Sequence, residues 1–153
     1  MKKYLFALFT FFILVSIGCA SDADKSGDVK WVENLEEGIK IAKAENKNIL
    51  VNFTGSDWCI WCKRLSGEVF TQKAFKDYAN KNLVLVKIDF PRQKQLPYET
   101  QMYNNNLARR YGVQGFPTII LLNSSGQMVG QSGYRQGGPE SYVQHLTQVF
   151  TKS

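Results

Sequence analysis

The residues with the clearest chemistry in this sequence are two cysteines three positions apart, Cys59 and Cys62. They follow the run Ile49-Leu50-Val51-Asn52-Phe53, which is apolar except for Asn52, and a helical pattern begins at Cys59. Two cysteines at this spacing can close a small disulfide, and the positive end of a helix stabilises the thiolate of the first one. The spacing therefore predicts a redox pair, with Cys59 as the attacking thiol and Cys62 as the thiol that resolves a mixed disulfide.

The same spacing also occurs in zinc sites, which need four ligands. The other candidate ligands are Cys19, in a segment that we expect to be processed, and His145, the only histidine of the chain. His145 lies in a helical pattern far from the cysteines, where we expect a solvated or half-buried side chain. We therefore expect no metal site.

The first residues predict export. Two lysines precede an apolar stretch from Tyr4 to Ile17, which is typical of a signal peptide over residues 1–19. Its end, Ser16-Ile17-Gly18-Cys19, resembles a bacterial lipobox, in which Cys19 is lipidated and becomes the new amino terminus. Cleavage after Ala20 is the alternative. We expect a protein of the periplasm or cell envelope, held to a membrane if Cys19 carries a lipid.

The remaining chain predicts a short tether and one domain. Residues 20–28 are polar and lack periodicity, as in a flexible linker, and residues 29–153 have the length of a single domain. The formal charge of the whole chain is +6, and two of its lysines belong to the expected signal peptide. No basic run with interleaved aromatic residues occurs, so we expect no nucleic-acid partner. We expect a monomer.

The pattern of apolar residues predicts alternating helices and strands. Asn34 can cap a helix that ends near Asn46. We then expect a strand over 48–54, a helical stretch over 59–80 broken at Ser66-Gly67 with Thr71 capping its second piece, a strand over 83–89, a loop over 90–98, a helix over 99–111, strands over 118–122 and 127–132, and a helix over 138–151. This order predicts an α/β fold with helical crossovers and a terminal hairpin.

From about Ile49 to Phe150, the sequence resembles the thioredoxin-fold family, and exported bacterial thioredoxin-like proteins in particular. Four segments carry the resemblance in order: Phe53 to Lys63, which contains Trp58 and the cysteine pair; Val86-Lys87-Ile88-Asp89; Tyr111-Gly112-Val113-Gln114-Gly115-Phe116-Pro117-Thr118; and Gly126 with Gly133. The resemblance implies a central mixed sheet of four to five strands flanked by helices. It also implies a thiol-disulfide oxidoreductase that needs no cofactor beyond its own cysteines.

The resemblance also implies a substrate groove. It predicts a cis bond between Phe116 and Pro117, in a loop that pairs with the backbone of an extended substrate, which adds Pro117 to the catalytic residues. The alternative is a trans proline that starts a strand. Gly115 and Phe116 would line the groove together with Trp58 and Trp61. Trp58 could instead be core packing with Trp61 as a cap on it, whereas an exposed Trp61 would suit unfolded protein substrates.

Some positions depart from the family pattern. Thioredoxin itself carries a buried aspartate where this chain has Asn52, and an amide cannot take a proton from the resolving thiol. Asp57 and Glu68 are the nearby carboxylates, and Asp57 is our candidate for assisting proton transfer; each could also be a solvated surface acid. Lys87 matches a strand lysine near the family's active site, or it is a strand-end charge that reaches solvent.

The dipeptide between the cysteines bears on the direction of electron flow. Ile60-Trp61 supplies no cation to stabilise the thiolate of Cys59, which argues against a strong oxidant. We expect a protein that reduces or isomerises disulfides of cell-envelope proteins and needs a redox partner that recycles its cysteines. The alternatives are an oxidase that introduces disulfides and a non-enzymatic client- or metal-binding module. The segment 90–106 is longer than a minimal thioredoxin needs, and it either shapes partner choice or is a surface elaboration.

Overall fold

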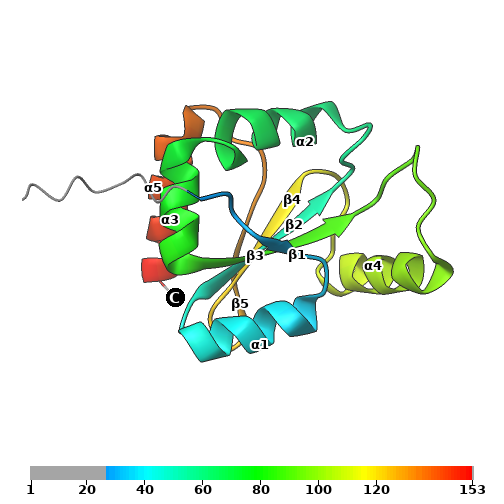
Figure 1. Ribbon diagram of the computed structural model, residues 1–153, viewed down its shortest axis with the longest axis horizontal. Helices are drawn as coiled ribbons and strands as arrows, with labels where there is room; N and C mark the ends of the chain where they lie inside the picture. The colour runs from blue at the N-terminus through cyan, green and yellow to red at the C-terminus, as the bar shows by residue number, and fades with distance from the viewer. Residues whose placement is uncertain (1–26, 153) are drawn as a thin grey trace, which may run out of the picture.

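A five-stranded mixed sheet forms the centre of the protein (Figure 1). The computed structural model describes residues 27–152, and the predictions made for residues 1–26, including lipidation of Cys19, lie outside them. The elements are β1 (Trp31–Val32), α1 (Leu35–Glu45), β2 (Asn48–Thr54), α2 (Ile60–Leu65), the π-helical turn η1 (Ser66–Phe70), α3 (Lys73–Asn82), β3 (Leu83–Asp89), α4 (Tyr98–Arg110), β4 (Thr118–Leu122), β5 (Met128–Ser132) and α5 (Gly138–Thr151). The expected α/β fold with a mixed sheet is confirmed.

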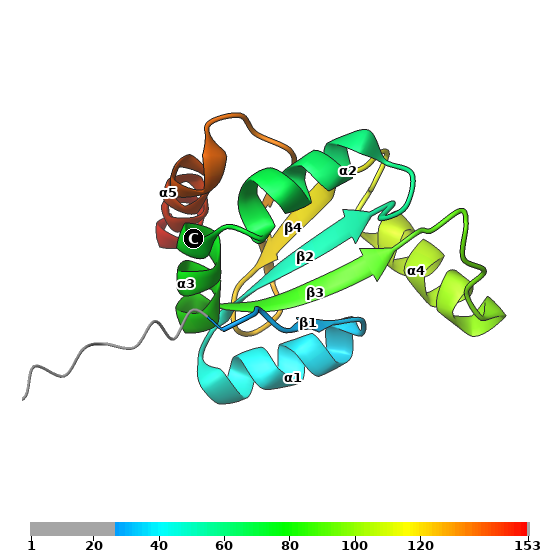
Figure 2. The same cartoon turned by 45° about the horizontal axis from the view of Figure 1, so that its top comes forward.

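The strands lie in the order β1-β3-β2-β4-β5. The first three are parallel, and β4 runs antiparallel to both β2 and β5. Helices α1 and α4 cover one face, and α2, η1, α3 and α5 cover the other (Figure 2). Because side chains alternate along a strand, Val51 and Phe53 pack in the α1 core, whereas Leu50 packs in the α2 core.

The first helix begins and ends where the sequence predicts. Oδ1 of Asn34 accepts a 2.8 Å hydrogen bond from the backbone amide of Glu37, as a capping side chain does. The helix ends at Asn46, whose φ of 51° lies in the left-handed region that asparagine tolerates better than most residues. No helix in residues 27–152 is both long and apolar enough to cross a membrane.

The sheet has an edge strand that the sequence does not reveal. Trp31 and Val32 pair with Leu85 and Val86, and two residues are too few to show a period. Just before this strand, two residues of the expected tether contact α3. Asp28 forms an ion pair with a lysine of α3, Lys76, and the carbonyl oxygen of Gly27 accepts a hydrogen bond from its Asn80.

The α-helix ends at Leu65, next to the break predicted at Ser66-Gly67, but the chain does not leave the helical conformation as expected. The helix continues there as η1, in which the amide of Thr71 donates to the carbonyl oxygen of Ser66. The hydroxyl of Thr71 and the side-chain amide of Gln72 both donate to the carbonyl oxygen of Gly67, and these bonds stabilise the wide turn. The interruption comes later, at the extended residue Gln72, which precedes α3 in place of the expected Thr71.

Candidate active site

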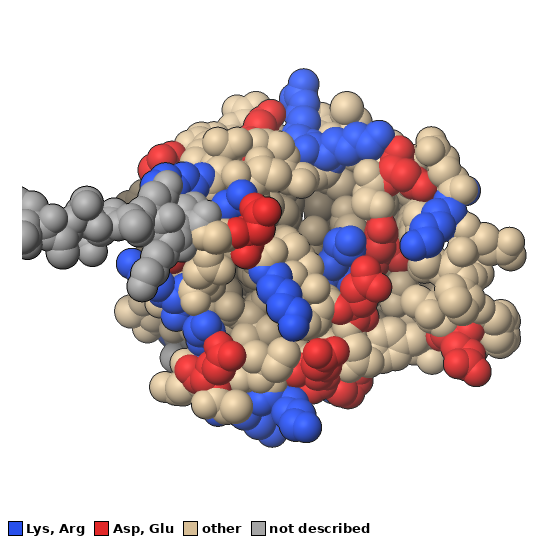
Figure 3. Space-filling view, in the orientation of Figure 1, with Lys and Arg blue, Asp and Glu red and all other residues tan. Residues whose placement is uncertain are grey.

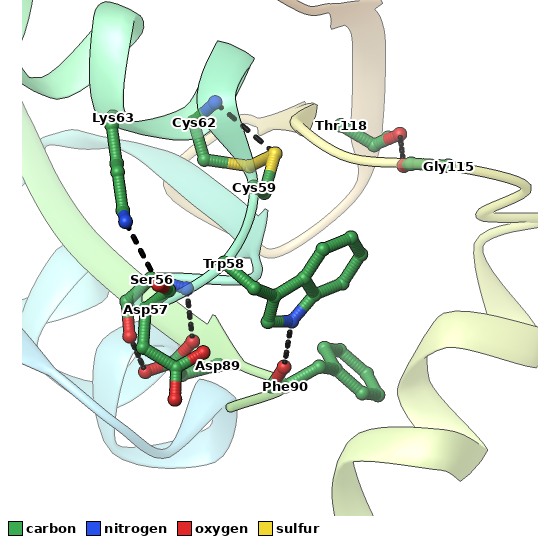
Figure 4. The surroundings of a disulfide bond; sticks show 10 residues. All are labelled: Ser56, Asp57, Trp58, Cys59, Cys62, Lys63, Asp89, Phe90, Gly115 and Thr118. Atoms are coloured by element: carbon green, nitrogen blue, oxygen red, sulfur yellow. Dashed lines mark hydrogen bonds between the residues drawn. A yellow bond between two sulfur atoms is a disulfide. The ribbon is translucent and has the colours of Figure 1, made fainter. Parts of the chain in front are cut away.

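Cys59 and Cys62 form a disulfide at the amino-terminal end of α2 (Figure 4). Cys59 is the N-cap residue, and its Sγ accepts a 3.1 Å hydrogen bond from the backbone amide of Cys62. The two residues are 6% and 5% exposed, so accessibility does not separate their roles. Their positions on the helix distinguish them, because the free amides of the helix end point to Cys59 and stabilise negative charge on its sulfur.

Trp58 forms one wall beside the disulfide. Its Nε1 donates a 2.8 Å hydrogen bond to the carbonyl oxygen of Phe90, and its ring meets that of Phe116 edge-on with centroids 5.9 Å apart. The ring lies directly over Gly55, where a Cβ atom would come within 2.5 Å of it. Gly55 is therefore needed for this position of the indole.

The peptide bond between Phe116 and Pro117 is cis, as predicted. The loop that carries it lies beside the disulfide in Figure 4, where Gly115 and Thr118 are drawn. Thr118 closes the loop, because its hydroxyl donates a 2.7 Å hydrogen bond to the carbonyl oxygen of Gly115. The ring of Phe116 is half-buried and stacks on Phe90 at 4.9 Å, so the loop is continuous with the wall formed by Trp58.

On the other side of the disulfide, α2 presents apolar side chains to solvent. Ile60 is 62% exposed and Trp61 is 47% exposed. The ring of Trp61 packs against Tyr134, with centroids 5.2 Å apart, and the guanidinium of Arg64 lies 5.0 Å from the ring centre. The hydroxyl of Tyr134 in turn donates to Glu68, which leaves that carboxylate in a surface network.

Asp57 holds the loop that follows β3. Its carboxylate accepts hydrogen bonds from the backbone amides of Arg92, at 3.1 Å to each oxygen, and of Gln93, at 2.7 Å. Desolvation opposes its ionisation, but these bonds outweigh that effect and hold the pKa of Asp57 below its usual value. The carboxylate is thus a weak base engaged with the loop, and its assistance in proton transfer stays a prediction.

A groove of about 670 Å³ reaches Cys62 from the side of the sheet. Asn52 and Lys87 are register partners on β2 and β3, and both line this groove. Asn52 is 8% exposed, and among the described residues nothing donates a hydrogen bond to its Oδ1. Lys87 is half-buried, with its Nζ 3.8 Å from a carboxylate oxygen of Glu33. An amide and a lysine therefore face the inner side of the redox turn.

Two contacts of the site lie beyond the sequence-based predictions. The guanidinium carbon of Arg92 lies 3.7 Å from the centre of the Trp58 ring. Asp89 accepts hydrogen bonds from both the amide and the hydroxyl of Ser56, at 3.0 and 2.6 Å. The second contact could be expected from sequence, since Ser56 follows β2, Asp89 ends β3, and these two strands are parallel neighbours. The first could not, because it depends on the course of the loop.

The histidine does not belong to this site. Its Nε2 lies 3.0 Å from the hydroxyl of Ser132, and the side chain is half-buried between α5 and β5, as the sequence indicates. Within residues 27–152, no group of three histidine, cysteine or acidic side chains is placed to hold a metal ion.

Comparison with known proteins gives the family of this chain. Residues 35–150 match the family of the Thioredoxin-like domain. The chain belongs to this thioredoxin-like family. The disulfide bond reductase DsbH of Chlamydia pneumoniae is 32% identical over 118 residues, which cover 77% of this chain and 70% of that protein.

Solved structures of thioredoxin-like proteins agree. The structure of a DsbH oxidoreductase superposes with a TM-score of 0.76 at 29% identity, over 83% of this chain and 88% of that one. A thioredoxin from Thermus thermophilus, 22% identical, shares the fold with a TM-score of 0.62 over 82% of this chain and 90% of its own. With the cysteine pair in place, this thioredoxin-like protein is a thiol-disulfide oxidoreductase. The pair itself carries the electrons, without an added cofactor.

Proposed function

We propose that this protein is an exported reductase of protein disulfides in the cell envelope. The observation that carries the direction is the setting of Cys59. Its sulfur accepts one hydrogen bond from the described residues, the 3.1 Å bond from the amide of Cys62, and the intervening Ile60-Trp61 is uncharged. A cation hydrogen-bonded to this sulfur would favour the reduced state and make the disulfide a strong oxidant, and within residues 27–152 none donates to it. The likeness to a protein named a disulfide bond reductase supports the same direction.

The reaction needs only the two cysteines and a disulfide substrate. The thiolate of Cys59 attacks one sulfur of the client disulfide, forms a mixed disulfide and releases the first client thiolate. The thiolate of Cys62 then attacks Sγ of Cys59, closes the disulfide seen here and releases the second client thiolate. Two electrons pass from the pair to the client, and the client thiolates take up the two protons that the cysteines lose. A dithiol protein must then reduce the pair again.

The reduction potential of the pair tests the direction of electron flow. We expect a value near that of thioredoxin, about −270 mV, after equilibration in graded thiol-disulfide buffers. A value near about −120 mV would identify an oxidase instead. Isomerase activity would appear as the recovery of native activity by a client protein whose disulfides had been scrambled.

Cysteine variants test the assignment of the two roles. Cys62→Ser is expected to accumulate a mixed disulfide between Cys59 and the client, whereas Cys59→Ser is expected to form none. If the variant with both cysteines replaced keeps its function in cells, the pair is dispensable. That outcome would favour the alternative of a non-enzymatic binding module.

Export and membrane attachment form the second part of the proposal. It is supported by the apolar stretch from Tyr4 to Ile17 and by the lipobox-like segment that ends at Cys19. Expression of the full chain in bacteria with radiolabelled palmitate should label the protein, and Cys19→Ser should abolish the label. Export without label would retain the location and remove the lipid anchor.

A further inference from the structure

In four of the segments that border the disulfide every charged side chain is cationic, and the acid Asp57 lies in the turn just before Cys59. The segments are 60–64 on α2, 91–94 after β3, 113–117 around the cis bond and 133–137 before α5. They border the disulfide because Trp58 contacts Phe90 and Phe116, and Trp61 contacts Tyr134. The charged residues that these segments carry are Lys63, Arg64, Arg92, Lys94 and Arg135. Figure 3 shows lysine and arginine side chains gathered over α2.

Within the described residues these cations form no close ion pair, although the charge of Lys63 helps to lower the pKa of Asp57. Among residues 27–152, no carboxylate forms an ion pair with any of the five. Lys63 donates to the backbone carbonyl oxygen of Asp57, and the guanidinium groups of Arg92 and Arg64 lie over the indoles of Trp58 and Trp61. Stacking on an aromatic face leaves most N–H donors of a guanidinium free for a carboxylate.

The acidic residues near these segments already accept hydrogen bonds from other groups of the protein. Asp57 accepts two backbone amides, Asp89 accepts from Ser56, and Glu68 accepts from Tyr134. They are fewer than the five cations, so an excess of positive charge remains around the exposed Ile60 and Trp61. A surface of this kind attracts segments of opposite charge and raises the rate at which they associate.

We propose that the redox face selects protein disulfides whose cysteines are flanked by acidic residues. Arg92 lies over Trp58, which precedes Cys59, and Arg64 lies over Trp61, which follows it between the two cysteines. An extended client that lies across Cys59 would therefore place side chains on both sides of its own cysteine near a guanidinium. The aromatic rings contact the apolar part of the client, and the two arginines bind its carboxylates. This inference rests on the proposed reductase function and names its substrate class.

Three peptides provide the test. Each is a homodimer joined by one disulfide, with two glutamates, two glutamines or two lysines beside the cysteine, and the full chain reduces it with dithiothreitol as electron source. We expect kcat/KM for the glutamate peptide to exceed that for the lysine peptide by about three- to tenfold. Raising the ionic strength from about 0.01 M to about 1 M should abolish the difference.

Charge-removing variants assign the effect to the two arginines. In the double variant Arg64→Gln/Arg92→Gln, the ratio of the glutamate to the lysine rate should fall to about one. The matched control is Lys40→Gln/Lys43→Gln on α1, which covers the opposite face of the sheet and should keep the ratio of the original chain. Equal rates for the three peptides, or an equal loss of preference in both double variants, would overturn the inference. Failure to reduce any of the peptides would instead count against the proposed reductase.

Discussion

The backbone amide of Gln93 donates a 2.7 Å hydrogen bond to Oδ2 of Asp57, a residue 36 positions earlier in the chain. This bond and those from the amide of Arg92 join the loop after β3 to the turn that carries the disulfide. Asp57, which immediately precedes Trp58, therefore has a structural role that the sequence does not reveal. It fixes the loop that brings Arg92 over Trp58.

The variant Asp57→Asn should loosen this loop. An amide oxygen accepts backbone N–H groups less strongly than a carboxylate does, so hydrogen exchange at Arg92 and Gln93 should accelerate by about tenfold. The amide of Phe90, which donates to Thr54, provides the control and should keep its protection. Unchanged exchange at Arg92 and Gln93 would mean that Asp57 does not hold the loop.

This effect should depend on pH. The hydrogen bonds lower the pKa of Asp57 in the folded protein, so ionisation contributes stability above the usual pKa of an aspartate, about 4. That contribution is lost as the pH falls through the lowered value. The difference in exchange between the original chain and Asp57→Asn should therefore be full near neutral pH and shrink in acid.

The variant Gly55→Ala should displace Trp58. Its new Cβ would lie 2.5 Å from the indole, which must move and lose the hydrogen bond to Phe90. We expect a shifted indole N–H resonance of Trp58 in NMR spectra and slower reduction of peptide disulfides. The matched variant is Gly67→Ala in η1, which has open space around it and should be neutral or stabilising by up to about 1 kcal/mol. An unmoved Trp58 resonance in Gly55→Ala would contradict this packing.

The buried amide of Asn52 predicts a gain of function. In Asn52→Asp, a carboxyl group would occupy the groove that reaches Cys62, beside Lys87. Burial should raise its pKa, and once ionised it can take the proton of the resolving thiol. The rate at which Cys62 resolves a mixed disulfide in stopped-flow experiments should rise by about tenfold above that pKa. The control Asn52→Leu should show no such rise; equal rates in both variants would exclude proton transfer through this position.

His145 should make stability depend on pH near neutrality. Burial, with a smaller effect of Arg135, lowers the pKa of His145 in the folded protein. The unfolded chain therefore binds a proton more readily, and stability is lost as the pH falls below about 6.5. The urea concentration at the midpoint of unfolding should be lower at about pH 5.5 than at about pH 7.5. The variant His145→Gln should make this difference smaller. An identical difference in both proteins would assign it to other groups.

Much of this fold can be predicted from sequence because its inner strands are buried on both faces. Runs such as Leu83–Asp89 and Thr118–Leu122 are almost continuously apolar, and that pattern arises from local composition alone. The edge strand Trp31–Val32 cannot be predicted in this way, because it is defined only by its pairing with β3. Likewise, η1 depends on side chains of Thr71 and Gln72 that return to the carbonyl oxygen of Gly67.

The same distinction applies to the site. The redox role of Cys59 and Cys62 follows from spacing and from a helix start, which are local features. The position of Arg92 over Trp58 requires a loop conformation that Asp57 fixes from a distant strand end. Sequence indicates that the loop exists and is long, but charges on a long loop can point anywhere until its backbone is held.

Both described ends of the domain lie at the same pole. Gly27 and Asp28 contact α3, and α5, which ends at Thr151, lies next to α3 in Figure 1, whereas the loop leading into α2 lies at the other side. A chain attached at either end would thus hold the domain by its base and present the sulfurs outward. Fusion of a reporter or a surface anchor at either terminus should leave the disulfide accessible to clients. Attachment to a support through either terminus should therefore orient the disulfide away from the support.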